Sequence, residues 1–210
     1  GKFEKGMKLQ VARTGRMITA SRPQKMMGDD REIVEDSYAG DVIGLTNPGA
    51  FAIGDTLFSG PAHQYPPIPS FSPTLFAYLK ASPGARKGFL KGLEGLLGEG
   101  AVQVLYSADD FITDPILAAV GELQFEVVQH RMQNEYKVET RLDHMPYSVA
   151  RWVEGGWEDV EKLGRIFNAV TVKDQWGRPV VLFRNEYALQ QLLLDEPGIK
   201  LSNHALPPLN

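Results

Sequence analysis

One feature of this chain constrains its fold more than any other: an apolar strand runs directly into an amphipathic helix between residues 118 and 138. Apolar residues recur there at helical spacing. One stripe consists of Phe125, Val128, Met132 and Tyr136. A second apolar ridge consists of Leu123 and Val127. Because both ridges need cover from water, the pattern predicts a helix that is packed on two sides.

Two residues mark the junction between this strand and this helix. Gly121 is expected to let the backbone turn sharply, because glycine has no Cβ. Glu122 falls in the first helical turn, where a carboxylate meets the positive end of the helix dipole. Nothing in the pattern demands a chemical role, so the simplest interpretation is a helix of the hydrophobic core.

Composition argues against several protein classes. No apolar run approaches the ~20 residues that cross a bilayer, and the first residues lack the apolar segment of a secretory signal. The 210 residues include no cysteine, which excludes disulfide scaffolds, thiolate zinc sites and cysteine nucleophiles. The histidines are too far apart in sequence for a ligand motif: His63, His130, His144 and His204. We expect a soluble cytoplasmic chain with two domains, no metal and no membrane partner.

Charge is distributed unevenly along the chain. Through Arg31, eight basic residues stand against three acidic ones, a net charge of +5, while the remainder carries −9. The seven basic residues that precede Arg31 are Lys2, Lys5, Lys8, Arg13, Arg16, Arg22 and Lys25. They either protect strand edges and loops as solvated charges or contact the phosphates of an RNA. The sequence leaves both interpretations open.

Residues 1–62 have the pattern of an all-β domain. Short apolar segments such as Met7–Ala12 and Val42–Leu45 alternate with turn residues, and a glycine turn precedes a strand at Gly6 and again at Gly54. This spacing predicts a small β-barrel. Because the chain begins at a predicted turn, with no strand ahead of Lys2, we expect a truncated barrel and a fragment of a longer protein.

Residues 63–73 predict a proline-rich linker. The segment from Gly60 to Pro73 holds five of the 14 prolines, a density that neither a helix nor a central strand tolerates. A semi-rigid connection between two domains follows from this composition. The alternative is a proline-rich ligand for a partner domain.

Residues 74–143 predict a ferredoxin-like βαββαβ unit. Its first helix is expected to begin with Ser82 as the N-cap and Pro83 at the first helical position. That helix is rich in glycine, with Gly84, Gly88, Gly92 and Gly95. Each glycine costs about 1 kcal/mol relative to alanine, so we expect a close approach of the helix to the sheet to explain them.

Residues 147–204 repeat the same order of elements. In chain order these are a strand (147–153), a helix (157–167), a hairpin around Gly177, a helix capped by Asn185 and a strand (199–201). The pattern predicts a second βαββαβ unit. The predicted fold class is therefore α+β, with a truncated all-β barrel at 1–62 followed by an α/β sandwich of two ferredoxin-like units at 74–210.

The order of several motifs resembles a family of translational GTPases. Gly121–Val128, followed by Tyr136–Glu139, is similar to the third domain of proteins of the elongation factor G type. A more specific resemblance, to the peptide chain release factor three family, extends over Gly1–Leu9, Tyr38–Leu45, Ile53–Thr56, Gly98–Val104, Ala119–Val127 and Ala150–Glu154. The last segment distinguishes that family from elongation factor G. The resemblance implies a barrel of the translation-factor domain II type followed by a release-factor C-terminal domain of the elongation factor G domain III type.

The resemblance also implies a non-catalytic role for this chain. It contains no Gly-x-x-x-x-Gly-Lys-Ser/Thr sequence, so we expect no catalytic, nucleotide-binding or metal-binding residues here. GTP and Mg²⁺ would belong to the family's GTP-binding domain, a partner in cis that this sequence lacks. The whole protein would be a GTPase that binds ribosomal RNA and proteins and promotes dissociation of class I release factors after peptide release. The basic residues from Lys2 to Lys25 then become candidate contacts to ribosomal RNA.

Other interpretations remain at this stage. An enzyme would use Asp143 with His144, or the acidic group Asp109, Asp110 and Asp114. A standalone adaptor would bind proteins through the acidic third domain. Trp152, Trp157 and Trp176 are candidates for its surface, although partial burial in the core is the simpler expectation for each. A fragment of another GTPase of the elongation factor G type is the remaining alternative.

Overall fold

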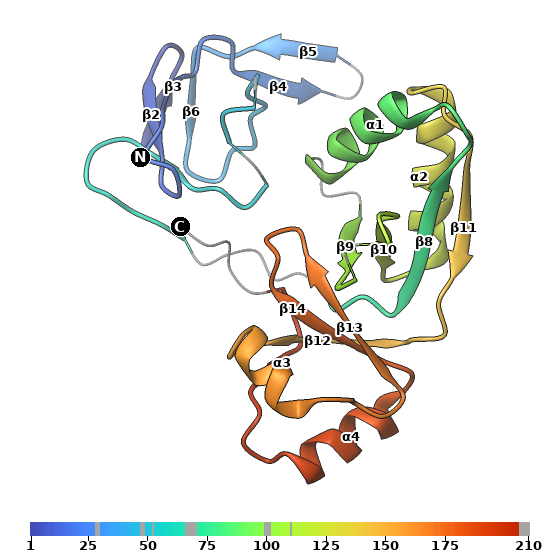
Figure 1. The fold of residues 1–210 in the computed structure, drawn as a ribbon. Helices are drawn as coiled ribbons and strands as arrows, with labels where there is room; N and C mark the ends of the chain where they lie inside the picture. Colours follow the sequence, from blue (N-terminus) through green and yellow to red (C-terminus); the bar gives the residue numbers. More distant parts are fainter. Residues whose placement is uncertain are drawn as a thin grey trace. The chain divides into compact units, whose positions relative to one another are not determined.

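A computed structural model describes residues 1–27, 30–46, 49–51, 53–65, 71–98, 102–109 and 111–205. The chain forms two compact units, Gly1–Ile68 and Pro69–Leu209, and Figure 1 shows their elements. The predicted linker lies partly outside the described residues, at 66–70. The predicted boundaries of the domains and of the linker stay a prediction.

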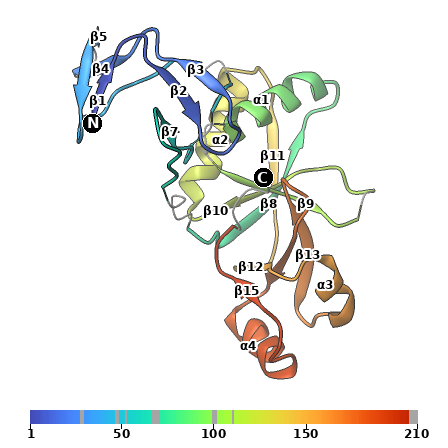
Figure 2. The ribbon, with the colours of Figure 1, turned by 90° about the vertical axis from the view of Figure 1, so that its left-hand side faces the viewer.

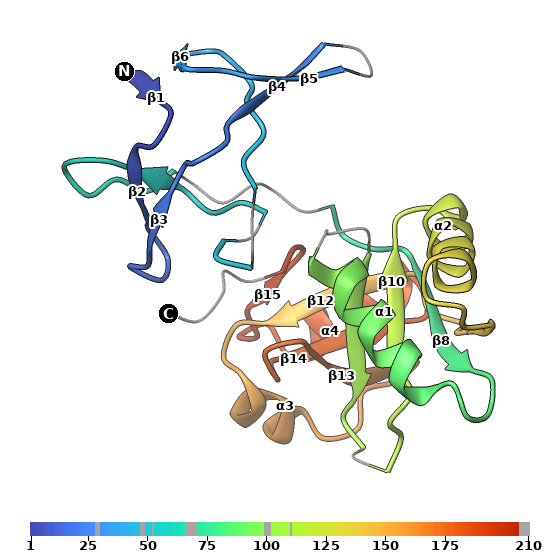
Figure 3. The same cartoon turned by 90° about the horizontal axis from the view of Figure 1, so that it is seen from above.

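The first unit is all-β, as predicted. Its strands are β1 (Lys2–Glu4), β2 (Lys8–Val11), β3 (Met17–Thr19), β4 (Gln24–Met27), β5 (Asp30–Ile33), β6 (Asp36–Tyr38) and β7 (Leu57–Phe58). They pair antiparallel as β1–β6, β3–β2–β7 and β4–β5. The β4–β5 pair forms an extended hairpin (Figure 3). Alternation along β2 places Leu9 and Val11 inside and leaves Lys8 exposed.

Two details of the first unit differ from expectation. The chain does not begin at a turn, because Lys2–Glu4 is a strand paired with β6. Residues 42–45 were expected to be a strand, but they form only an isolated bridge between Gly44 and Gln24. Gly40, with φ at 99°, turns the chain just before this segment, and no long partner strand lies beside it in the described part of the unit.

The first half of the second unit has the predicted βαββαβ order. It consists of β8 (Leu75–Ala81), α1 (Arg86–Gly98), β9 (Gln103–Ser107), β10 (Ile116–Ala119), α2 (Glu122–Asn134) and β11 (Thr140–His144). The spatial order is β11–β8–β10–β9, with every neighbouring pair antiparallel. This is the strand arrangement of a ferredoxin-like sheet.

The second half repeats the plan. It consists of β12 (Val149–Val153), α3 (Trp157–Leu163), β13 (Ala169–Asp174), β14 (Pro179–Phe183), α4 (Glu186–Asp195) and β15 (Leu201–Ser202). The spatial order is β13–β14–β12–β15, and β13 pairs with β9 of the first half. The two sheets therefore join at corresponding strands into one continuous sheet of eight strands. The predicted α+β class and the ferredoxin-like repeat are confirmed.

The two halves pack face to face. Alternate residues of each strand point to opposite faces, so one face of the first half carries α1 and α2, and one face of the second carries α3 and α4. The other two faces form a common core, in which Phe76 and Ile116 meet Trp152 and Leu182. Figure 2 shows the two helix pairs on opposite sides of the strands. The second unit is thus a four-layer sandwich of helix, sheet, sheet and helix, in which the two sheet layers are the two halves of the continuous sheet.

Helix α2 is packed on one side rather than two. Phe125, Val128 and Met132 are buried as predicted, but Leu123 is 70% exposed and Val127 is 43% exposed. The second apolar ridge thus remains in water. Gly121 also differs from expectation: its φ of −150° is extended backbone that any residue adopts, and a Cβ there would meet open space.

The start of α1 differs as well. Ser82 is not its N-cap, because Ala85 N–H donates to the Ser82 carbonyl and Gly84 has a φ of 84°. Proline followed by a left-handed glycine is the signature of a type II turn, so the helix begins later, at Arg86.

The glycines of α1 allow contact with α2 and the residues after it, not with the sheet. A Cβ on Gly92 would lie 2.5 Å from Met132 Sδ and 3.0 Å from Tyr136 Cγ, and one on Gly88 would lie 2.9 Å from Val138 Cγ2. Close packing against α2 and the residues after it therefore explains why α1 contains glycines, although glycine disfavours a helix.

Candidate nucleic-acid interface

The seven predicted RNA contacts all lie in the first unit. Lys2 is on β1, Lys8 on β2 and Lys25 on β4, while the other four occupy the turns and connections beside β1, β2 and β3. The basic excess of residues 1–31 is balanced by acidic residues elsewhere in the first unit. Residues 32–55 of the same unit contribute five carboxylates, so that the whole unit has eight basic and eight acidic residues.

Four of the seven are paired with carboxylates of the same unit. Lys2 Nζ lies 2.9 Å from Glu4 and 3.2 Å from Asp36, and the hydrogen bonds to these two carboxylates raise the pKa of Lys2. Lys5 Nζ lies 2.7 Å from Glu35 Oε1. These exposed pairs contribute little to stability, but they reduce the positive charge that a ligand would meet.

Arg13 forms the strongest of these pairs. Its Nε and Nη2 donate to the two oxygens of Asp55 at 2.6 and 2.7 Å, and the Asp55 side chain is only 5% exposed. This bidentate hydrogen bonding raises the pKa of the guanidinium. Lys25 is held more loosely, 3.9 Å from Asp41 Oδ1. Arg13 therefore has a structural role, joining the β2–β3 turn to the segment before β7.

Lys8, Arg16 and Arg22 form no ion pair with any described residue. Arg16 and Arg22 lie at opposite ends of β3 and line a cavity of about 190 Å³. The cavity is further lined by Met17, Ile18, Thr19, Ala20, Ser21, Leu45, Thr46, Ala50 and Phe51. Lys8 is directly opposite Thr19 across the β2–β3 ladder and shares its outer face. The seven residues thus fall into two groups. Four are paired with carboxylates, and three have no ion-pair partner among the described residues.

The chemistry of this cavity suits part of a nucleotide. Arg16 and Arg22 line the cavity, and each guanidinium group can donate paired hydrogen bonds to phosphate oxygens. Hydroxyl groups of Thr19, Ser21 and Thr46 add shorter-range donors and acceptors. The apolar lining from Ile18 and Phe51 provides surface for a sugar or base.

Three residues of the enzyme interpretation, Asp109, Asp143 and His144, have structural partners. Asp143 lies 2.6 Å from Lys80 Nζ, whose hydrogen bond lowers the pKa of Asp143. The His144 ring packs edge-on against Phe125 at 5.8 Å. Asp109 Oδ1 accepts from the Phe111 N–H within a turn, and Asp110 lies outside the described residues. Among described residues, no group of three or more His, Asp or Glu side chains is placed to hold a metal.

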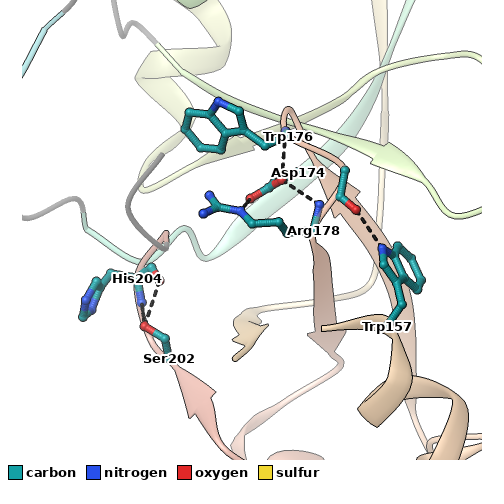
Figure 4. A network of polar contacts seen from close by, with 7 residues as sticks. Trp157, Asp174, Trp176, Arg178, Ser202 and His204 are labelled. Carbon is teal, nitrogen blue, oxygen red and sulfur yellow. Dashed lines mark hydrogen bonds and ion pairs between the residues drawn. The ribbon is translucent and has the colours of Figure 1, made fainter. Parts of the chain in front are cut away.

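The tip of the β13–β14 hairpin is a polar cluster that the sequence analysis missed. Asp174 accepts hydrogen bonds from the Trp176 and Arg178 backbone and from Arg178 Nε (Figure 4). Asp at the first position of a turn and Gly177 at the fourth are the pattern that could have predicted it. Of the three tryptophans, Trp152 is buried, whereas Trp157 and Trp176 are partly exposed.

The described helices include none that is long and apolar enough to span a membrane.

Comparison with known proteins links both units to translation factors. A family model described as the C-terminal domain of class II release factor RF3 matches residues 65–193, and one described as elongation factor G domain 2 matches residues 1–60. The crystal structure of a protein from Thermus thermophilus is similar in fold, with a TM-score of 0.57 and 19% identity. That similarity covers 85% of this chain and 26% of the other.

Several curated proteins are similar over nearly the whole chain. Peptide chain release factor 3 of Rippkaea orientalis is 60% identical over 98% of this chain, and that of Acaryochloris marina is 60% identical over 100%. The Nostoc punctiforme protein of the same name is 62% identical over 96%. In each case the chain spans 38% of the relative's length.

Proposed function

The chain belongs to the peptide chain release factor 3 family, and from this premise we propose that it is the non-catalytic C-terminal portion of a translation-termination GTPase. It binds the ribosome and promotes dissociation of class I release factors after peptide release. GTP and Mg²⁺ are bound by a separate domain of the same protein, which acts in the cytoplasm. The name of the relatives, and the match to a C-terminal domain model, support this assignment.

The proposed role is mechanical. A factor that shifts the ribosome from one conformation to another must bind the two conformations with different affinity. A rigid body meets this requirement better than a flexible one, because its contacts cannot adapt equally to both shapes. The second unit suits this task, since one continuous sheet and a shared core connect its two halves.

The observation that carries the ribosome-binding proposal is the cavity between Arg16 and Arg22. Both guanidinium groups lack an ion-pair partner among described residues, and Lys8 is the cross-strand partner of Thr19, which lines the cavity. We assign these three residues as the direct contacts to ribosomal RNA phosphates. Lys2, Lys5, Arg13 and Lys25 instead neutralise carboxylates within the unit.

Neutralising the unpaired arginines tests this assignment. The variant Arg16→Gln/Arg22→Gln is expected to bind ribosomes at least about tenfold more weakly, because each charged hydrogen bond contributes roughly 1.5–3 kcal/mol. Ribosome co-sedimentation or a filter-binding titration with the 210-residue chain measures the affinity. The matched control is Lys2→Gln/Lys5→Gln, which removes the same charge from residues that are already paired.

The control variant is expected to lose less than about threefold in affinity, because its lysines already have partners. Equal losses in the two variants would mean that net charge alone governs binding. Unchanged binding by the arginine variant would show that the cavity is not part of the ribosome interface.

A further inference from the structure

One segment of the acidic second unit carries positive charge alone. The unit has 14 basic and 18 acidic residues, yet no carboxylate occurs from residue 69 to residue 93. The cations of this segment are Lys80, Arg86, Lys87 and Lys91. Lys80 Nζ lies 2.6 Å from Asp143, whereas the other three, all on α1, form no ion pair within the described part of the chain. Helix α1 therefore concentrates positive charge that the fold does not neutralise.

A lysine from another element lies beside the start of α1. A Cβ on Gly88 would lie 2.9 Å from Val138 Cγ2 and 3.4 Å from the Tyr136 carbonyl oxygen, so the loop that holds Lys137 contacts the first turns of α1. Figure 1 shows this loop, between α2 and β11, next to that end of the helix. Lys137 is exposed and has no ion-pair partner among the described residues. Arg86, two positions before Gly88, lies on the opposite side of α1 from this loop.

We call Lys87, Lys91 and Lys137 the lysine patch. Lys87 and Lys91 are exposed and one helical turn apart, so their side chains are neighbours. They lie away from the sheet, because Phe89 and Leu93 occupy the buried side of the same helix. The surface that α1 and the α2–β11 loop present to water thus carries three unpaired ammonium groups.

Two properties of the lysine patch work against the stability of the fold. Lys87 lies in the first turn of α1, where a cation meets the positive end of the helix dipole, and that turn has no carboxylate. Lys137 has a φ of 58°, a left-handed conformation that only glycine adopts without strain. The dipole of α2 favours a cation just after its end, but it does not require this backbone conformation. Unfavourable charge and backbone strain together indicate a site that binds an anion.

The composition of the lysine patch favours nucleic acid over protein. Protein interfaces are depleted in lysine and enriched in aromatic residues. Phe89 is the one aromatic residue of α1, and it is only 8% exposed. Lysine binds phosphate oxygens as a point charge, which suits a backbone of irregular shape. An RNA strand therefore fits this surface better than a protein does.

We infer that the lysine patch binds backbone phosphates of ribosomal RNA. This inference rests on the proposed function. The patch is a second contact, on a different unit from the Arg16–Arg22 cavity, so each contact can be removed without the other. Glu94 and Glu139 flank the patch without pairing with its lysines, and they limit its extent.

Ribosome binding by Lys87→Gln/Lys91→Gln/Lys137→Gln tests the inference. The affinity of the 210-residue chain is expected to fall about tenfold. The slope of the logarithm of the association constant against the logarithm of salt concentration should become shallower by about 2–3, because three phosphate contacts are lost at roughly 0.7–0.9 each. Far-UV circular dichroism shows whether the variant is folded.

The matched control is Lys162→Gln/Arg165→Gln/Lys200→Gln. It removes the same formal charge from three exposed positions in the second half of the same unit. Its affinity is expected to fall less than about threefold, because net charge then acts only at long range. An equal loss in the two triple variants would overturn the inference.

Lys137→Gly separates binding from folding. This change removes the charge and relieves the left-handed strain, so the midpoint of urea denaturation should stay the same or rise. Ribosome affinity should nevertheless fall about twofold to fourfold. A loss of affinity in a chain of undiminished stability cannot result from unfolding. Undiminished affinity in this variant would remove Lys137 from the contact and overturn the inference for the patch as a whole.

Hydroxyl-radical probing of ribosomal RNA, at saturating concentrations of each chain, identifies the partner. The wild-type chain is expected to protect backbone positions that the triple variant of the lysine patch leaves cleaved and that Arg16→Gln/Arg22→Gln still protects. Weaker binding with an unchanged pattern of protection would assign the patch to a ribosomal protein and overturn the inference, as would undiminished binding by the triple variant. Failure of the wild-type chain to bind ribosomes would instead overturn the proposed function.

Discussion

Replacing Trp152 by alanine is expected to lower the free energy of unfolding of the second unit by about 3–5 kcal/mol. Trp152 is among the largest fully buried side chains, and it lies in the core that both halves of the eight-stranded sheet share. Its removal leaves a cavity against strands of both halves, including Phe76 and Leu182. The two halves should therefore lose stability together and unfold in one transition.

Urea denaturation followed by far-UV circular dichroism measures this effect. Trp152→Phe is expected to lose less, because it fills much of the cavity and removes an indole N–H that is buried without a hydrogen-bond partner. Phe167→Ala is the control, since that ring is 74% exposed and its loss should change stability by less than about 0.5 kcal/mol. Similar stability of Trp152→Ala and the control would contradict the shared core.

Replacing Asp174 by alanine is expected to have an effect of similar size, about 3–5 kcal/mol. The side chains of Asp174 and Arg178 are 5% and 11% exposed, so the change leaves a largely buried guanidinium without its carboxylate. The backbone N–H groups of Trp176 and Arg178 also lose their acceptor. The hairpin should then lose the geometry that holds Trp176.

Two further variants separate these contributions in the same denaturation experiment. Asp174→Asn keeps an oxygen for the backbone N–H groups and should be less destabilising than Asp174→Ala. Adding Arg178→Met to Asp174→Ala removes the buried cation that has lost the Asp174 carboxylate and should recover part of the lost stability. If Asp174→Ala retained wild-type stability, the polar cluster would have no structural role.

The order of elements in the second unit could be predicted because local signals agree there. Asn185 caps α4 as expected, with its side chain accepting from the Ala188 N–H at 3.0 Å. The stripe Phe125, Val128 and Met132 is buried at helical spacing. Periodicity could not show that Leu123 remains exposed, because burial depends on whether another element covers that side of the helix.

Errors arose where the deciding contact is distant or where two local signals compete. Ser82 and Pro83 are compatible with both a helix start and a turn. The segment forms the turn, because Gly84 adopts a left-handed backbone conformation. The glycines of α1 suggested a close neighbour, but its identity as α2 follows from tertiary packing. Neither outcome is visible within a short window of sequence.

The candidate interface needed the structure for the same reason. Arg13 and Asp55 are 42 positions apart, and Lys5 and Glu35 are 30 apart, so the charge of residues 1–31 says nothing about which cations are already paired. Among the described residues, the fold leaves Lys8, Arg16 and Arg22 of the seven basic residues without an ion-pair partner. The Asp174–Arg178 turn was missed because its hydrogen bonds, rather than apolar periodicity, define it.

The most direct test of the account is the salt dependence of ribosome binding by the 210-residue chain. Phosphate contacts release counterions, so the logarithm of the association constant should fall linearly with the logarithm of salt concentration. In Arg16→Gln/Arg22→Gln the slope should be shallower by about 1.5, because two contacts are lost at roughly 0.7–0.9 each. Binding that is independent of salt, or slopes that do not differ between wild type and variant, would contradict an RNA-binding role for this chain.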